Sequence, residues 1–140
     1  MSKSSNIDVL SGVALFEGFS KRELRFLADQ TREVWFNPGQ DIVREGGKAG
    51  GVFVIAEGNA KLIVGGRARK TLGPGACIGE MSLLDGAPRS ATVRANTRLR
   101  ALQLTSWNFL ALLEENWSMA RKVMAELSRR VRTLEKGLID

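Results

Sequence analysis

Two side chains of opposite charge, Glu80 and Arg89, are nine residues apart in the stretch Gly79–Val93, which reads GEMSLLDGAPRSATV. The start of this stretch would open a short helical turn. The free N–H groups at its beginning, including those of Met81 and Ser82, would point at one spot that favours an anion. Arg89 would add a bidentate, charge-assisted hydrogen bond to the same anion. The spacing therefore predicts a phosphate-binding loop.

Glu80 must accept a hydrogen bond from another group of the ligand, because its carboxylate would otherwise only repel a neighbouring phosphate. Ribose hydroxyls can donate such a bond, and Ser90 offers a further hydroxyl next to Arg89. One short segment could thus bind a phosphate and the adjacent sugar. The alternative is a surface loop in which Glu80 and Arg89 pair with each other, since such ion pairs are common and contribute little to stability.

The middle of the chain must supply the framework for this loop. Twelve of the fifteen glycines lie between Gly39 and Gly86, and short apolar runs alternate with Gly and Pro turn signals, as in a sandwich or barrel. The Gly65-Gly66 pair suits a tight hairpin because both residues can take positive φ. The expected strands cover residues 33–36, 41–43, 52–55, 60–64, 68–72, 91–94 and 99–104.

Helical patterns flank this region on both sides. Ser20 and Glu23 form an S-x-x-E capping box, which predicts a helix over about residues 20–29. After the last strand, Thr105 or Ser106 would cap another helix.

The predicted fold class is α+β and mainly β: an antiparallel, jelly-roll-like β-roll flanked by N-terminal helices and two C-terminal helices. We expect a single domain over residues 1–140, because a chain of 140 residues can bury one core and is too short for two. Its parts are the N-terminal helices at 1–31, the roll at 32–104 and the C-terminal helices at 105–138.

The second C-terminal helix should begin near Trp117 and carries an apolar stripe with heptad spacing. The stripe consists of Ala120, Met124, Leu127, Val131, Leu134 and Leu138. Two interpretations stay open: the stripe lies on the roll, or it forms a short coiled coil in a homodimer.

The chain contains no histidine and a single cysteine, Cys77. Nucleophilic triads and the common zinc and iron sites need imidazole or paired thiolates, so these chemistries, including those of jelly-roll metalloenzymes, are excluded. Cys77 cannot form an internal disulfide, and no apolar run approaches the roughly 20 residues that cross a bilayer. We expect a cytoplasmic protein that does not enter the membrane.

The formal net charge is +6, which raises the question of nucleic-acid binding. Basic residues gather near the C-terminus, but Glu126 and Glu135 interrupt them and no aromatic residues are interleaved. We therefore expect a solvated basic helix face rather than a nucleic-acid surface, with an acidic partner as the other alternative.

Residues 79–91 resemble the phosphate-binding cassette of the cyclic nucleotide-binding domain family, whose members include catabolite activator proteins, regulatory subunits of cAMP-dependent kinase and cyclic-nucleotide-gated channels. We call these residues the cassette. The resemblance extends over nearly the whole chain and includes LFEGFSKRELRFLA at 15–28, NPGQDIVREG at 37–46 and VFVIAEGNAKLI at 52–63.

The resemblance implies that Glu80 binds the ribose 2′-hydroxyl and Arg89 the exocyclic oxygens of a cyclic phosphate. It also implies backbone or hydroxyl contacts from Gly79, Met81, Ser82, Ser90 and Ala91. A threonine directly after the arginine tends to favour cGMP in this family. Because Ser90 stands there, the resemblance favours cAMP, with cGMP as the alternative.

The base would lie near apolar side chains, for which Ile78 and Val64 are candidates, with a role as core residues of the strands as the equal alternative for both. Arg129 or Arg130 of the last helix could stack on the purine or simply face solvent.

The expected function is that of a sensor without catalytic activity or cofactor, which signals to an effector protein by moving the helix that starts near Trp117. Two rival hypotheses stay open: a fragment of a DNA-binding transcription regulator, and a dimerisation module with a vestigial pocket. Because the sequence ends at Asp140, we expect either a stand-alone sensor or a segment of a longer chain.

Overall fold

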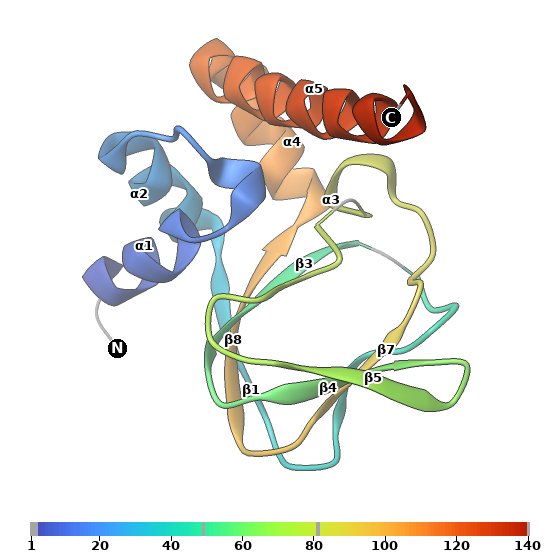
Figure 1. The fold of residues 1–140 in the computed structure, drawn as a ribbon. Helices are drawn as coiled ribbons and strands as arrows, with labels where there is room; N and C mark the ends of the chain where they lie inside the picture. The colour runs from blue at the N-terminus through green and yellow to red at the C-terminus, as the bar shows by residue number, and fades with distance from the viewer. Residues whose placement is uncertain (1–2, 49, 81, 140) are drawn as a thin grey trace.

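Two facing antiparallel sheets form the centre of the molecule (Figure 1). The computed structural model describes residues 3–48, 50–80 and 82–139. Within these residues, one sheet has the strand order β1-β8-β3-β6 and the other β2-β7-β4-β5. The strands are β1 (Arg32–Phe36), β2 (Asp41–Val43), β3 (Gly51–Glu57), β4 (Ala60–Val64), β5 (Arg67–Leu72), β6 (Cys77–Ile78), β7 (Thr92–Ala95) and β8 (Leu99–Thr105). The predicted jelly-roll-like β-roll is confirmed.

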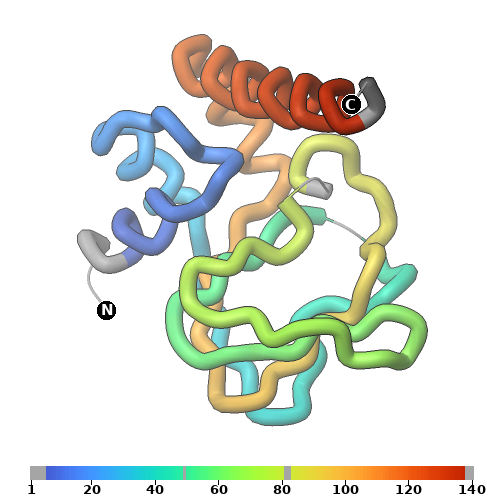
Figure 2. The backbone as a smooth tube through the Cα atoms, viewed as in Figure 1, coloured from blue at the N-terminus to red at the C-terminus, as the bar shows by residue number. Residues whose placement is uncertain are grey.

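Helices lie at both ends of the chain, as predicted. At the N-terminal end are α1 (Lys3–Ser11), a 3-10 turn at Ala14–Phe16 and α2 (Lys21–Gln30), and at the C-terminal end α4 (Ser106–Glu115) and α5 (Trp117–Ile139). The short α3 (Ser82–Asp85) lies between β6 and β7. The long α5 lies across the top of the molecule (Figure 1). The segment between α3 and β7, drawn in yellow, approaches the C-terminal half of α5 (Figure 2). No helix in the described part of the chain is long and apolar enough to span a membrane.

Local signals account for the helix and hairpin boundaries. The Ser20 hydroxyl accepts a bond from the Glu23 N–H at 3.1 Å, and the Glu23 carboxylate accepts one from the Ser20 N–H at 2.8 Å. This is the predicted capping box, and it begins α2. Thr105 caps α4 through its hydroxyl, and Gly65 and Gly66 take φ of 60° and 79° in the β4–β5 turn.

Strands β3 and β8 divide the hydrophobic core into two parts because their side chains alternate between the two faces of the sheet. One face packs against the helices through Val52, Val54, Leu102 and Leu104, together with Leu10, Leu27, Phe109 and Met119. The opposite face fills the roll through Ile55, Leu99 and Ala101, together with Ile42, Ile78 and Val93. Ile78 and Val93 of this second part also line the cavity that forms the candidate site.

Helix α5 packs on the body of the protein with a face that coincides only partly with the expected one, since Leu127 is the member of the stripe that packs against the core. Met119 and Val123 are fully buried there, whereas Met124, Val131 and Leu134 of the heptad stripe are 47%, 53% and 70% exposed. The interpretation that the stripe lies on the roll is therefore wrong for these three residues. The i, i+4 pair Met119 and Val123 is the contact that the sequence reading missed.

Candidate anion-binding pocket

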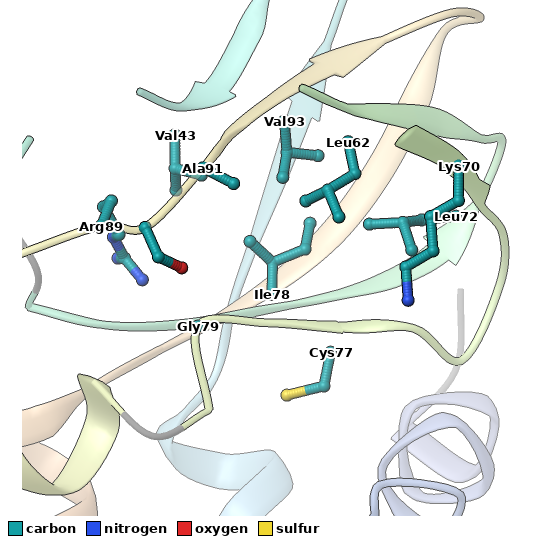
Figure 3. A pocket seen from close by; sticks show the side chains of 11 residues that line it. Val43, Leu62, Lys70, Leu72, Cys77, Ile78, Gly79, Arg89, Ala91 and Val93 are labelled. Atoms are coloured by element: carbon teal, nitrogen blue, oxygen red, sulfur yellow. The ribbon is translucent and has the colours of Figure 1, made fainter. Parts of the chain in front are cut away.

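A cavity of about 210 Å³ lies between the two sheets (Figure 3). It is lined by Val43, Leu62, Lys70, Leu72, Cys77, Ile78, Gly79, Arg89, Ser90, Ala91 and Val93. Arg89 and Gly79 lie at one end, and Leu72 and Lys70 lie at the opposite end in Figure 3. The cavity thus has a cationic end formed by the cassette and a mainly apolar end formed by β4, β5 and β7.

Arg89 is the buried cation of this site. The residue is only 8% exposed, and its Nε and Nη1 have no hydrogen-bond partner within the described residues. Its backbone is fixed by the turn after β2: the Gly46 N–H donates to the Arg89 carbonyl at 2.8 Å, and the Arg89 N–H donates to the Gly47 carbonyl at 3.0 Å. Burial lowers the pKa of Arg89. An unpartnered buried guanidinium is costly unless an anion completes it, so the cationic end suits an anionic ligand.

Gly79 allows the guanidinium to occupy this place. Its φ is +78°, and a Cβ built on it would overlap Nη1 of Arg89. Any side chain at position 79 would therefore be strained and would displace the arginine. The predicted neighbourhood of Gly79 and Arg89 is present in the structure.

Glu80 pairs with the last helix rather than with Arg89. The Arg130 Nη2 lies 2.8 Å from the Glu80 Oε1, and the Arg130 Nε donates to Glu126 at 3.0 Å. Arg129 also bonds to Glu126, at 2.9 Å. The alternative of a surface pair between Glu80 and Arg89 is therefore wrong. Arg130 is therefore not a simple solvent-facing cation, whereas the side chain of Arg129 is 56% exposed and faces solvent, as one of the two alternatives had it.

The other predicted site residues are placed as follows. Ser90 and Ala91 line the cavity beside Arg89, and Ser82 is the first residue of the four-residue helix α3. Met81 lies outside the described residues. Of the two apolar candidates for the base, Ile78 lines the cavity and Val64 does not.

Sequence reasoning missed the apolar end of the cavity. Leu62 and Leu72 were seen only as strand residues, and the two-residue strand β6 that carries Cys77 was not expected. Burial, with a smaller contribution from the Glu80 charge, raises the pKa of the Cys77 thiol, which therefore stays protonated. Lys70 was also missed. A possible signal was the period-2 alternation of β5, although a bulge interrupts its pairing with β4.

The arrangement can hold an anion at Arg89 and an apolar, planar group between the leucines. Glu80 follows Gly79 directly in the chain, but it is not among the residues that line the cavity. Among the residues that the structure describes, no cluster of His, Cys, Asp or Glu side chains could hold a metal ion.

Comparison with known proteins agrees with this geometry. The model of the family described as cyclic nucleotide-binding domain matches residues 33–116. The cyclic AMP receptor protein of Thermus thermophilus is 31% identical over 134 residues, which are 92% of this chain and 62% of that protein. A cGMP-dependent protein kinase of Toxoplasma gondii is 34% identical over 92 residues, 66% of this chain and 9% of the kinase.

A solved structure shows the same fold. The N-terminal domain of a transcriptional regulator from Streptomyces coelicolor A3(2) superposes with a TM-score of 0.86 at 29% identity, covering 92% of this chain and 96% of that one. The chain spans less than two thirds of the length of the curated relatives it matches.

Proposed function

This chain belongs to the cyclic nucleotide-binding domain family, and from that premise we propose that it binds a cyclic purine mononucleotide, cAMP ahead of cGMP, in the cavity between Arg89 and Leu72. The cyclic phosphate lies against Arg89 and the start of α3, and the ribose 2′-hydroxyl donates to Glu80. The purine lies among the apolar side chains of β4, β5 and β7. The protein has no catalytic activity of its own and needs no cofactor.

The observation that carries this proposal is the state of Arg89. The Arg89 side chain is 8% exposed, and its Nε and Nη1 lack partners among the described residues. Such a guanidinium is stabilised by an anion that presents two acceptor oxygens in the plane of its N–H groups. The equatorial and axial oxygens of a cyclic phosphate meet this requirement. The apolar end then accommodates the base, which is the least polar part of such a ligand.

The preference for cAMP rests on Ser90, which stands where a threonine would favour cGMP. The names of the relatives do not decide between the two, because one is a cyclic AMP receptor protein and another a cGMP-dependent kinase. We also propose that the nucleotide acts on an effector protein by shifting α5, whose Arg130 bonds to the cassette. Such a sensor would work in the cytoplasm, where the lone thiol of Cys77 stays reduced.

Calorimetric titration of the refolded, nucleotide-free protein with cAMP and cGMP tests the proposal. We expect Arg89→Met to lower cAMP affinity by at least about a hundredfold, because two charge-assisted hydrogen bonds are lost. The unliganded variant should be at least as stable as the wild type, since a buried charge without a partner is removed.

Arg67→Met is the matched control, because Arg67 is an exposed cation of β5 that does not line the cavity. If the wild type binds neither nucleotide, the cavity serves another anion and the proposal is wrong. If Arg89→Met binds cAMP like the wild type, the phosphate does not lie where we place it.

A further inference from the structure

A second cavity, of about 290 Å³, adjoins the first one at Arg89. Arg89 and Val43 line both cavities, and Figure 3 shows these two residues at the same end of the first cavity. The second cavity lies against the glycine-rich segment between β2 and β3, and we call it the loop cavity. Its lining includes Arg44, Lys48 and Gln103 beside Arg89, and none of its described lining residues is Asp or Glu.

Gln103 is a polar side chain directed into the roll. It comes two residues after Ala101 on β8, and residues with this spacing point to the same face of a sheet. Ala101 packs in the part of the core that fills the roll, as does Phe53, which lies opposite Gln103. The Gln103 amide has no hydrogen bond within the part of the chain that the structure describes. Its N–H groups are therefore available to a ligand in the loop cavity.

Arg89 has more donors than one ligand uses. A guanidinium carries five N–H donors, and a bidentate contact with a cyclic phosphate takes two of them. The protein supplies no partner for Nε and Nη1 among the described residues. Part of this buried cation therefore still needs an acceptor when the first cavity is filled.

Lys48 adds an exposed ammonium group to the loop cavity. It has no ion pair within the described residues, whereas Arg44 pairs with Asp41 at 3.3 Å. The loop cavity thus brings together unused donors from Lys48, Gln103 and Arg89, and no lining carboxylate matches them. This is the composition of an anion site rather than of a solvent-filled gap.

We propose that the loop cavity binds inorganic phosphate, through Lys48, Gln103 and the donors of Arg89 that the nucleotide leaves unused. A phosphate ion offers several acceptor oxygens and neutralises a cation that burial leaves without a partner. Binding of phosphate here does not require the proposed function. Its effect on the cyclic nucleotide does rest on that function, because the two ligands then share one guanidinium.

The two anions should weaken each other's binding. One anion neutralises part of the Arg89 charge and repels the other anion. By linkage, phosphate lowers cAMP affinity by the same factor by which cAMP lowers phosphate affinity. We expect a factor of about three to ten, which is reached at saturation and not exceeded. Competition for one site would instead lower cAMP affinity in proportion to the phosphate concentration, without a plateau.

Calorimetric titration with inorganic phosphate at constant ionic strength, with and without saturating cAMP, tests the site. We expect about millimolar binding in both conditions, as for a few hydrogen bonds on a partly solvated site. Gly50→Asp is the decisive variant. Gly50 lines the loop cavity, and a Cβ built on it would meet no atom within 4 Å, so a carboxylate can be added there. This variant should weaken phosphate by at least about tenfold, and Gly50→Asn, of the same size and without the charge, by less than about threefold.

Two further variants remove donors from the site. Lys48→Met and Gln103→Leu should each weaken phosphate by about three- to tenfold, the effect of one lost hydrogen bond. Lys21→Met is the control, because Lys21 is an exposed cation of α2 that lines neither cavity. The affinity for cAMP in phosphate-free buffer shows that each variant is folded.

A wild type that binds no phosphate at millimolar concentrations overturns the proposal. It is also overturned if Gly50→Asp and Gly50→Asn bind phosphate alike, since the anion then lies elsewhere. A cAMP affinity that falls without a plateau as phosphate rises means that the anion occupies the first cavity, and the loop site is then wrong. If the wild type binds phosphate as expected but no cyclic nucleotide, the loop site stands and the proposed function is contradicted.

Discussion

Arg130 of α5 and Glu80 of the cassette form an ion pair with 2.8 Å between Nη2 and Oε1. Arg130 also donates through Nε to Glu126 at 3.0 Å, so the guanidinium joins one carboxylate of its own helix to one of the cassette. Glu80 is the residue that we assign to the ribose. A single carboxylate therefore takes part both in the proposed ligand contact and in holding the last helix, which couples the two.

Removal of Arg130 should uncouple the helix from the ligand. In Arg130→Met we expect the effect of cAMP on hydrogen exchange of α5 to fall by more than about half, because α5 loses its direct bond to the cassette. Hydrogen exchange with and without saturating cAMP measures this effect. Arg132→Met is the control, since Arg132 is exposed on the same helix. An equal response to cAMP in Arg130→Met and the wild type would rule out this route of coupling.

Gly79 should be essential for ligand binding in a way that another glycine of the same conformation is not. Gly79 and Gly66 have φ of +78° and +79°, but only at Gly79 would a Cβ meet Arg89, while Gly66 has open space. We expect both Gly79→Ala and Gly66→Ala to cost about 1–2 kcal/mol of stability through backbone strain. Only Gly79→Ala should also lower cAMP affinity, by about tenfold or more, as the guanidinium is displaced.

Urea unfolding and calorimetry on the two variants check this expectation. A similar cAMP affinity in both variants would show that the backbone at position 79 adapts without moving Arg89. A large loss of affinity in Gly66→Ala would point instead to a general effect of strain in the roll.

Local sequence determined much of this fold. The capping box of Ser20 and Glu23 and the hairpin at Gly65–Gly66 involve residues within three positions of each other, so their geometry can be read from the chain. The proximity of Gly79 and Arg89 could be anticipated for a related reason, since only nine residues, which include the short helix α3, separate them.

The rest depends on tertiary placement. Arg130 meets Glu80 only because α5 packs over the cassette, and the two residues are fifty positions apart. Strand β6 has two residues, too few for an alternation to be recognised. Lys70 belongs to a run of exposed residues and nevertheless lines the cavity, and a bulge between Leu62 and Ile63 changes the register of β4 and β5 beside it.

The exposed stripe of α5 should mediate self-association. Met124, Val131 and Leu134 are 47–70% exposed and lie away from the buried Met119 and Val123. A charge in this stripe would be desolvated in a dimer, so Val131→Asp should weaken dimerisation by at least about tenfold. Sedimentation velocity over a concentration series measures it. Thr133→Asp, which places the charge on another side of the helix, is the control. A wild type that stays monomeric at all concentrations would refute the dimer.

The contact between α2 and α5 should make stability depend on pH. Burial raises the pKa of Glu23, but hydrogen bonds from Lys122, from the Ser20 backbone and from Ser118, with the charge of Lys122, outweigh it and leave the pKa at about 2 instead of 4.5. The Lys122 Nζ lies 2.6 Å from the Glu23 Oε1. Because the folded-state pKa lies below the unfolded one, this stabilisation is complete above about pH 4.5 and is lost as the pH falls toward 2.

Glu23→Gln isolates this contribution, since a glutamine at the third helical position can still complete the capping box with Ser20. We expect the variant to be less stable at pH 7 by at most about 3 kcal/mol, and the difference from the wild type to shrink progressively below about pH 4.5. Urea unfolding from pH 3 to 7 measures both, with Glu114→Gln on the exposed side of α4 as the control. Parallel curves for Glu23→Gln and the wild type over this range would mean that the bond to Lys122 does not hold α5 against α2. The helix would then be positioned by Met119, Val123 and the Arg130 ion pair, and acid would not release it through Glu23.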